Sequence, residues 1–403
     1  MDKNMTGKIS LRRPITTEDI IRKMKKETMT RRQRVLAALN HEPLDRFPID
    51  FGMHYSTGIS AFAYRDLREH LGLPVSPVVV PDPWQFLARV DEDVLKRFHI
   101  DTMLLHPGYK YTSVWKPRGK YEFVIPRKMA PVLQPDGGWL SKDGAAEMRM
   151  PDGGFFFDGW QFNVDEEDGD EMLRRFGAEA EHIYNETDYF TMHIGFFAYG
   201  AGDMEFSCKM LTDPDEAMEQ IKGWHNWQMT NARKIIETYG KHIQGVCIAG
   251  DLGTQTAPFM APSLYEEMIH PYMKELVKFI KNNSDYKVFM HSCGAVKRFI
   301  PYFIDEEIDA LNPVQVSAAD MDPATLKKEF GGKIAFWGGG CDTQRILNLK
   351  GPREVRENVK ALTQIFKQNS SFIFNQVHNI MGNVKPENIV AMFDTAYENS
   401  FYI

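Results

Sequence analysis

The chain has 403 residues, of which 43% are hydrophobic and 26% are charged, as is typical of a soluble globular protein with one large domain or two ordinary ones. The net charge of -7, without a basic stripe that could contact phosphates, argues against nucleic acid as the main partner. No apolar run approaches membrane-spanning length, and the charged N-terminus lacks the apolar core of a signal peptide. Four cysteines do not make a disulfide framework, so we expect a cytoplasmic protein in which Cys208 and Cys247 are buried core thiols.

The first part of the chain predicts a polar extension followed by helices and strands. Residues 1–29 are polar and mixed in charge, and we expect this N-terminal extension to lie on the surface. Thr30 can cap the first helix because its side-chain oxygen can accept a hydrogen bond from the first turn. The predicted helices cover 31–40, about 60–71 and about 84–98, and the predicted strands cover 47–51 and 102–106.

The segment 114–164 differs from the rest of the chain in its richness in glycine, aspartate and aromatic residues. It contains the pairs Asp136-Gly137 and Asp152-Gly153, which are turn signals between antiparallel strands. We therefore expect an antiparallel β insertion that covers one end of the main domain, followed by a helix over 166–187.

From residue 189 onward, strands and helices alternate regularly. The predicted strands cover 191–196, 245–249, 287–291, 310–311, 333–337 and 372–374, and the predicted helices cover 213–239, 262–282, 296–303, 323–330, 352–369 and 386–398. With the two earlier strands this makes eight strands, each followed by a helix, which predicts an α/β fold of the (β/α)8 TIM barrel type over residues 30–403. A doubly wound open sheet is the alternative, but no Gly-x-Gly-x-x-Gly follows the first strand.

Two of the predicted strands end in side chains that can bind a metal. His291 and Cys293 follow the apolar run 287–290, and Cys341 follows the run 333–337 and three glycines. Because active sites of α/β proteins lie at the carboxyl ends of parallel strands, we expect these three side chains to meet. Three protein ligands with an open fourth position are typical of catalytic zinc. The alternative is a core histidine with two inert thiols.

Other residues that follow predicted strands are candidates for the pocket. Asp251 is a candidate catalytic proton donor or substrate contact, with a turn cap for the following loop as the alternative. His378 is a second catalytic candidate, with a buried hydrogen-bonded histidine as the alternative. The candidate substrate contacts are His54, Tyr55, Trp84, Phe197, Tyr199 and Asn375, and the rings among them favour an apolar, ring-accepting pocket.

Three segments resemble the uroporphyrinogen decarboxylase superfamily, and the resemblance extends from about Arg31 to the C-terminus. They are Arg32 to Pro48, Asp251 to Gln255, and His378-Asn379-Ile380 followed by Pro386 to Ile389. His291, Cys293 and the distant Cys341 make the chain similar to the zinc-dependent corrinoid methyltransferase branch. The true decarboxylases carry an arginine-rich Met-Arg-Gln-Ala-Gly-Arg motif after the first strand, where this chain has Asp50 to Ser56 without an arginine. This departure speaks against decarboxylation of a polycarboxylate.

The resemblance implies an O-demethylation reaction in anaerobic one-carbon metabolism. A methyl group would pass from a small methoxylated, aromatic compound to the Co(I) cobalamin of a separate corrinoid protein, since this chain has no corrinoid-binding Asp-x-His-x-x-Gly sequence. Zn2+ would act as a Lewis acid on the ether oxygen. Its fourth ligand would be water or a carboxylate such as Asp251 or Glu205. The superfamily often dimerises, so a homodimer is also expected.

Three alternatives remain open at this point. A methylcobamide:thiol methyltransferase would use the same metal to bind a thiol as thiolate. A porphyrinogen decarboxylase would have the same fold. A zinc-bearing scaffold or corrinoid-handling protein would have no catalytic activity of its own.

Overall fold

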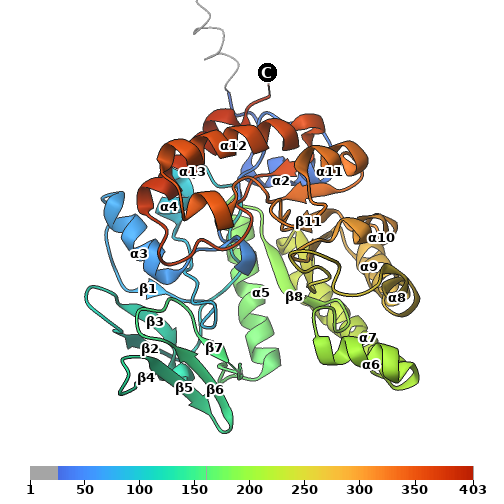
Figure 1. Cartoon of the computed structure of the whole chain (residues 1–403), viewed down its shortest axis with the longest axis horizontal. Helices are drawn as coiled ribbons and strands as arrows, with labels where there is room; N and C mark the ends of the chain where they lie inside the picture. The colour runs from blue at the N-terminus through green and yellow to red at the C-terminus, as the bar shows by residue number, and fades with distance from the viewer. Residues whose placement is uncertain (1–25, 160, 403) are drawn as a thin grey trace, which may run out of the picture.

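The computed structural model describes residues 26–159 and 161–402, and a six-stranded parallel sheet forms its centre (Figure 1). The order of the strands is β13-β12-β11-β10-β9-β8, so each strand pairs with its neighbours in sequence. The strands are β8 (Met192–Phe197), β9 (Gly245–Ala249), β10 (Lys287–His291), β11 (Ala310–Asn312), β12 (Ala335–Trp337) and β13 (Phe372–Ile373). The regular alternation predicted after residue 189 is confirmed as an α/β fold with a parallel sheet.

Helices alternate with these strands along the chain. They are α5 (Gly169–Glu186), α6 (Met204–Thr212), α7 (Pro214–Tyr239), α8 (Pro262–Met268), α9 (His270–Asn283), α10 (Ile300–Asp305), α11 (Pro323–Phe330), α12 (Pro352–Phe366) and α13 (Pro386–Ser400). Proline occupies the first turn of α7, α8, α11, α12 and α13, where its missing N–H costs no helical hydrogen bond. The single helix predicted over 262–282 is instead two helices that meet at Ile269.

The two strands predicted before residue 110 are present only as single bridges. Ile49 forms a parallel bridge with Phe374, and Thr102 forms one with Phe190, so these segments flank opposite edges of the sheet. They also contact each other, because the N–H of Asp101 donates to the carbonyl of Ile49 at 2.8 Å.

Helices α2 (Arg31–Leu39) and α3 (Ala61–His70) form as predicted, and Thr30 caps α2. The helix predicted over 84–98 is wrong, because only α4 (Glu92–Arg97) is helical there. Asp82 Oδ1 accepts from the N–H groups of Trp84 and Gln85, which makes a turn instead of a helix. Phe86 then has a positive φ of 57°, which no right-handed helix allows.

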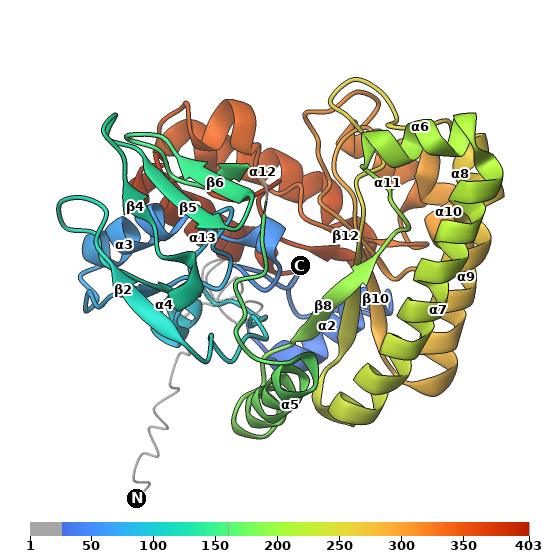
Figure 2. The same cartoon turned by 90° about the horizontal axis from the view of Figure 1, so that it is seen from below.

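The insertion predicted over 114–164 forms two small sheets, and the first also includes the earlier strand β1. One has the order β1-β3-β2 and the other β4-β5-β6-β7. The strands are β1 (Val78–Val79), β2 (Thr112–Trp115), β3 (Phe123–Pro126), β4 (Val132–Leu133), β5 (Trp139–Asp143), β6 (Ala146–Met150) and β7 (Asp158–Gly159). All their pairings are antiparallel except that of β1 with β3. Figure 2 shows these strands on the opposite side of the molecule from α7, α9 and α10.

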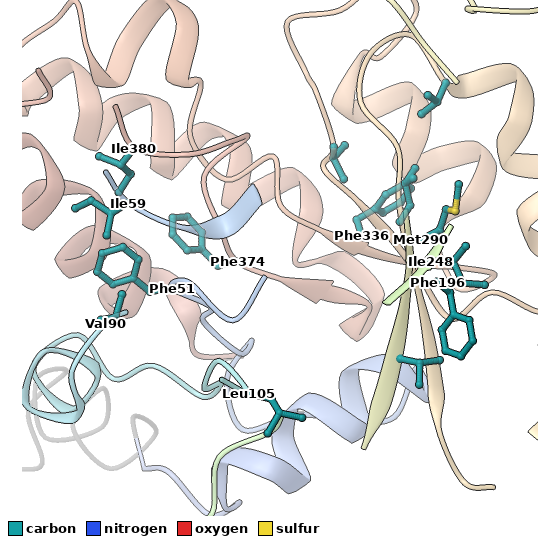
Figure 3. Packing of buried hydrophobic residues seen from close by; sticks show 14 of the residues in the cluster. Phe51, Ile59, Val90, Leu105, Phe196, Ile248, Met290, Phe336, Phe374 and Ile380 are labelled. Atoms are coloured by element: carbon teal, nitrogen blue, oxygen red, sulfur yellow. The ribbon is translucent and has the colours of Figure 1, made fainter. Parts of the chain in front are cut away.

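Two apolar clusters fill the interior. The larger one joins the outer face of the sheet to the helices and reaches the insertion. Figure 3 shows part of it, including Phe51 and the strand residues Ile248 and Phe336. The second cluster takes alternate strand residues, such as Cys247 between Val246 and Ile248, and α2 packs against it through Val35, Ala38 and Leu39. Side chains alternate between the two faces of a strand, so the two clusters belong to the two faces of the sheet.

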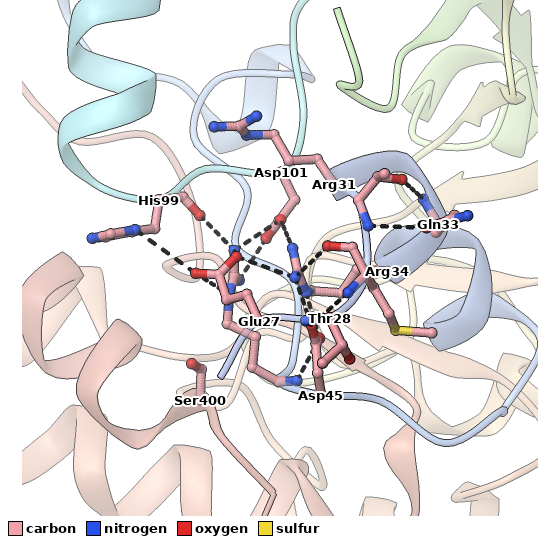
Figure 4. Close-up of polar contacts among 12 residues, drawn as sticks. Glu27, Thr28, Arg31, Gln33, Arg34, Asp45, His99, Asp101 and Ser400 are labelled. Atoms are coloured by element: carbon pink, nitrogen blue, oxygen red, sulfur yellow. Dashed lines mark hydrogen bonds and ion pairs between the residues drawn. The ribbon is translucent and has the colours of Figure 1, made fainter. Parts of the chain in front are cut away.

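A buried ion-pair network joins α2 to the beginnings of the two bridged segments (Figure 4). The Arg34 guanidinium lies 2.7 Å from Asp45 and 2.6 Å from Asp101, and Arg46 lies 2.7 Å from Asp101. Glu27 contacts both arginines. These contacts give a structural reason for Arg34, Asp45 and Arg46 of the Arg32 to Pro48 motif. They also place the described end of the predicted extension, residues 26–29, against the body of the protein. Residues 1–25 lie outside the described residues.

The two cysteines outside the predicted metal site have different environments. Cys247 is fully buried, as predicted. Cys208 is exposed, contrary to the prediction, because α6 turns Phe206 and Met210 inward and Cys208 lies two residues from each, on the other side of the helix.

Among the described residues, no helix combines the length and the apolar character that crossing a membrane would require.

Candidate metal centre

Three donor side chains meet beyond the carboxyl ends of the strands. The ligand atoms of His291, Cys293 and His378 all lie within 4.8 Å of one another. His291 is the last residue of β10, Cys293 follows it by two residues, and His378 lies in the loop after β13. The distance from His291 Nε2 to Cys293 Sγ is 3.6 Å. Imidazole nitrogen and thiolate sulfur are the ligands that zinc prefers, so the donor set fits this metal.

The loop after β10 is held on both sides by neighbouring strand-end loops. Asp251 Oδ1 accepts from the N–H of Cys293 at 2.8 Å, and Ser292 Oγ accepts from the N–H of Leu252 at 2.9 Å. The N–H of Ser292 donates to the carbonyl of Asn312 at 2.7 Å. The loops after β9, β10 and β11 therefore fix the direction in which the Cys293 side chain leaves the backbone.

Gly294 completes the loop because no other residue fits there. Its φ is +86°, and a Cβ at this position would collide with the backbone of Gly253. Its N–H donates to Gln315 Oε1 at 2.8 Å. The sequence His291 to Gly294 therefore has a structural requirement for its glycine as well as two donor side chains.

Burial keeps the donor side chains uncharged. It lowers the pKa of His291 and lowers that of His378 to about 4, and the neighbouring His291 adds to the second shift. Burial also raises the pKa of the Cys293 thiol well above its usual range, and the nearby Asp251 raises it further. Near neutral pH the site thus presents two neutral imidazoles and a thiol, and the thiol must lose its proton when a metal binds.

Cys341, the third predicted ligand, is not part of this group of three. It is fully buried in the larger apolar cluster, and burial raises the pKa of its thiol. Its backbone nevertheless adjoins the His378 loop, because the N–H of Val377 donates to the Cys341 carbonyl at 3.0 Å. Its role as a ligand stays a prediction, and His378 is the donor that the structure brings to His291 and Cys293.

His54 and Asp251 lie beside the three donors. The ring centroid of His54 is 5.0 Å from that of His291, and burial lowers the pKa of His54 well below its usual value. Asp251 Oδ1 lies 3.8 Å from His291 Nε2, and the Asp251 side chain is half exposed. Both residues are thus placed to contact a metal or a ligand bound by the three donor side chains. Glu205, the other carboxylate considered, lies exposed in the first turn of α6.

An aromatic cavity of about 290 Å³ adjoins the donor group. His378 and Trp84 both line it, and the insertion covers it with Phe155, Phe156 and Phe157. The remaining lining residues are Ser60, Gln85, Leu87, Asp158, Gln161, Asn379, Ile380 and Met381. A second hollow of about 170 Å³ is lined by Tyr55 together with Trp84 and His106. Trp84 thus lines both cavities, and the predicted contacts Tyr55 and Trp84 both line the smaller one.

The other three predicted substrate contacts have different surroundings. The ring of Phe197 contacts those of Trp224 and Trp227 on α7. Tyr199 is fully buried, and its hydroxyl lies 2.9 Å from His225 Nδ1. Asn375 is also fully buried, beside the glycine turn that follows β12. The structure does not bring these three residues to the aromatic cavity, and a role for them in substrate binding stays a prediction.

Asn312 and Ser56 are neighbours of the site that the sequence reasoning missed. Asn312 Oδ1 lies 2.9 Å from His291 Nδ1, and Ser56 Oγ lies 2.7 Å from the same oxygen. Asn312 is the last residue of β11, so the rule that strand ends carry functional side chains could have found it.

Comparisons with known proteins agree with this architecture. The model of the family "Uroporphyrinogen decarboxylase (URO-D)" matches residues 200–399, which contain all the donors described above. A uroporphyrinogen decarboxylase from Legionella pneumophila (strain Paris) is 26% identical over 142 residues, which is 35% of this chain and only 38% of that protein. A solved methyltransferase from Methanosarcina mazei aligns with a TM-score of 0.54 and 12% identity over 92% of this chain and 99% of its own. The last likeness is one of fold alone, and the proteins matched are enzymes of two different kinds.

Proposed function

We propose that this chain is a zinc-dependent methyltransferase that moves a methyl group from a methoxylated aromatic compound to the Co(I) corrinoid of a partner protein. The observation that carries the proposal is the group of His291, Cys293 and His378 at the strand ends, next to a cavity covered by aromatic rings. Bound there, zinc would polarise the ether oxygen and stabilise the departing oxyanion.

His291 and Cys293 would be the constant ligands of the metal. His378 is the third ligand in the arrangement described here, and Cys341 is the alternative because its backbone adjoins the same loop. Either set leaves an open position for substrate, as a catalytic zinc requires. Asp251 and His54, which lie beside the donors, would contact the substrate or carry a proton to or from its oxygen.

The cavity supports an uncharged aromatic donor. Phenyl and indole rings form much of its wall, and among its lining residues there is no lysine or arginine, while Asp158 adds a negative charge. Arg118, a nearby cation, is held 4.6 Å from the Phe62 ring centroid and 5.4 Å from that of Phe155. A porphyrinogen with several carboxylates would find no cation in this wall, which weakens the decarboxylase alternative in spite of the family name.

We also propose that the sheet closes into a (β/α)8 barrel. The bridges Ile49 to Phe374 and Thr102 to Phe190, with the hydrogen bond between Asp101 and Ile49, support two further strand positions between β13 and β8. The second apolar cluster would then be the barrel interior, with α2 at the end where the strands begin. The donors would lie at the carboxyl face, where barrel enzymes hold their active sites.

The corrinoid would be carried by a separate protein that meets this face during turnover. A methylcobamide:thiol methyltransferase would use the same donors, but the aromatic cavity favours an aryl ether over a small thiol. A cytoplasmic location and a homodimer belong to the same proposal.

Zinc analysis and methyl transfer test the proposal together. The purified protein should contain about one zinc per chain and form methylcobalamin from 2-methoxyphenol and reduced cobalamin, read from the corrinoid spectrum. Cys293→Ala should lose more than about 100-fold in rate, because residues that merely support a metal ligand already contribute 10–100-fold.

Cys208→Ala is the matched control, because Cys208 is exposed on α6 and should leave both measurements unchanged. A zinc-free wild-type protein whose activity survives Cys293→Ala would overturn the proposal. Release of carbon dioxide from uroporphyrinogen would instead favour the decarboxylase.

A further inference from the structure

The hydrogen bonds of the Asn312 side chain beside His291 fix the orientation of its amide. Its Nδ2 group donates to the backbone carbonyl of Trp337 at 3.0 Å. Rotating the amide by 180° would bring its oxygen against that carbonyl, and two acceptors would then face each other. The Trp337 carbonyl therefore fixes the amide with Oδ1 toward His291.

The fixed amide determines which nitrogen of His291 carries the proton. Oδ1 of Asn312 can only accept, so His291 Nδ1 at 2.9 Å must be protonated and donate to it. In a neutral ring with its proton on Nδ1, Nε2 holds the lone pair. This is the nitrogen that lies 3.6 Å from Cys293 Sγ.

A second donor reaches the same amide from a distant part of the chain. Ser56 Oγ lies 2.7 Å from Asn312 Oδ1 and 2.8 Å from His54 Nδ1. Ser56 belongs to the 3-10 helix Tyr55–Thr57 in the loop after residues 47–51. The amide of Asn312 thus connects the loop beside His54 to β10, β11 and β12.

We propose that Asn312 is the positioning residue that presents His291 Nε2 to the metal, and that Ser56 and the Trp337 carbonyl hold it in this orientation. The inference rests on the proposed function for the presence of the metal. The orientation of the ring and the position of its proton belong to the metal-free protein and can be measured there. Supporting hydrogen bonds of this kind fix the tautomer of a histidine ligand and raise its basicity.

The experiment compares Asn312→Leu, Ser56→Ala and the control Asn388→Leu. Leucine matches asparagine in shape but removes the acceptor, while Ser56→Ala leaves the bond between Asn312 and His291 intact. Asn388 is equally buried and donates to the carbonyls of Leu347 and Lys350, away from the donor group, so its variant reports the general cost of losing a buried amide.

Two readouts are measured on each protein. The first is the tautomer of His291 in the metal-free protein, from long-range 1H–15N correlation of 15N-histidine, with His291→Ala to assign the signal. The second is the dissociation constant for zinc, from competition with a chromophoric chelator. A merely structural role for Asn312 would lower the melting temperature without moving either readout.

The wild type and Asn388→Leu should show Nδ1–H on His291 and equal zinc affinity. Asn312→Leu should lose the single tautomer and bind zinc about 10–100-fold more weakly. Ser56→Ala should keep the tautomer and bind zinc about threefold to tenfold more weakly, as expected from the loss of one hydrogen bond.

Unchanged zinc affinity and tautomer in Asn312→Leu would overturn the inference while leaving the proposed function intact. If Asn312→Leu does not fold, two other results would overturn the inference. One is a proton on Nε2 of His291 in the wild type, and the other is full zinc affinity in Ser56→Ala. A wild type that shows Nδ1–H but binds no zinc would overturn the proposed function and leave only the orientation of the ring.

Discussion

The two ends of the parallel sheet both bury polar side chains, but the two sets differ in charge and in whether their lone pairs are free to bind a cation. Where the strands begin, Arg34 and Arg46 meet Asp45 and Asp101 at salt-bridge distances. Where the strands finish, His291, Cys293 and His378 are neutral donors held by backbone contacts and amides. Matched charges bind each other and fix one arrangement, whereas neutral donors with free lone pairs can accept a cation. The first set therefore serves stability, and the second is suited to binding.

The largest expected effect follows from breaking the ion-pair network. Arg34→Met should lower the free energy of unfolding by about 3–5 kcal/mol, because it leaves Asp45 and Asp101 without one of their buried partners. Urea denaturation would measure the loss, and zinc affinity should not change in the folded fraction. Arg353→Met is the control, since its pair with Glu354 is exposed and should contribute less than about 1 kcal/mol. A large fall in zinc affinity in Arg34→Met would show that the two ends are coupled.

The identity of the third ligand gives the next largest effect. His378→Ala should weaken zinc binding by more than about 100-fold, whereas Cys341→Ala should leave it unchanged and only lower stability through a small cavity. Chelator competition measures the first quantity and urea denaturation the second. The reverse result would assign the site to His291, Cys293 and Cys341.

The dependence of zinc affinity on pH tests the same assignment without mutation. Burial raises the pKa of both Cys293 and Cys341, so each thiol is protonated between pH 6 and 8 and must release one proton to become a ligand. His378 releases none there, because its pKa is lowered to about 4, and the lowered pKa of His291 leaves that ring neutral in the upper part of this range. Affinity should therefore rise with pH by about tenfold per unit with one cysteine ligand and about hundredfold per unit with two. If the logarithm of zinc affinity rises by about two per pH unit, the set with His378 is contradicted. If zinc affinity does not change with pH, a thiolate ligand is contradicted.

The smallest expected effect concerns the charge of the cavity. Metal-free protein should bind 2-methoxyphenol more tightly than 2-methoxybenzoate, because Asp158 and the absence of a lining cation oppose a carboxylate. Asp158→Asn should narrow the difference by about fivefold or less, since the side chain is exposed and its charge is screened. Calorimetry would measure both ligands, with Asp143→Asn as a control elsewhere in the insertion. Tighter binding of the benzoate would exclude the neutral-substrate interpretation.

The features that could be predicted best from the sequence are those set by residues adjacent in the chain. The run from Lys287 to His291 is a strand because its apolar side chains are buried on both faces, and the glycine after Cys293 marks a turn that only glycine can make. The helix predicted over 84–98 failed for a local reason as well, because Asp82 captures the N–H groups that would have started it. Cys208 was assigned to the core because free cysteines are usually buried, and the helix on which it lies, α6, was not predicted.

The amino-acid sequence by itself determined the alternation of strands and helices, the antiparallel pairing of most of the insertion, and the presence of His291 and Cys293 at one strand end. These follow from periodicity, turn chemistry and the residues next to each other in the chain. Only the tertiary structure decided that His378 joins them in one group of potential ligands, and that Asn312 and Ser56 lie at hydrogen-bond distance beside the His291 ring. Those contacts join residues 21 to 256 positions apart, and their geometry depends on how the loops after separate strands pack together, which no local pattern specifies.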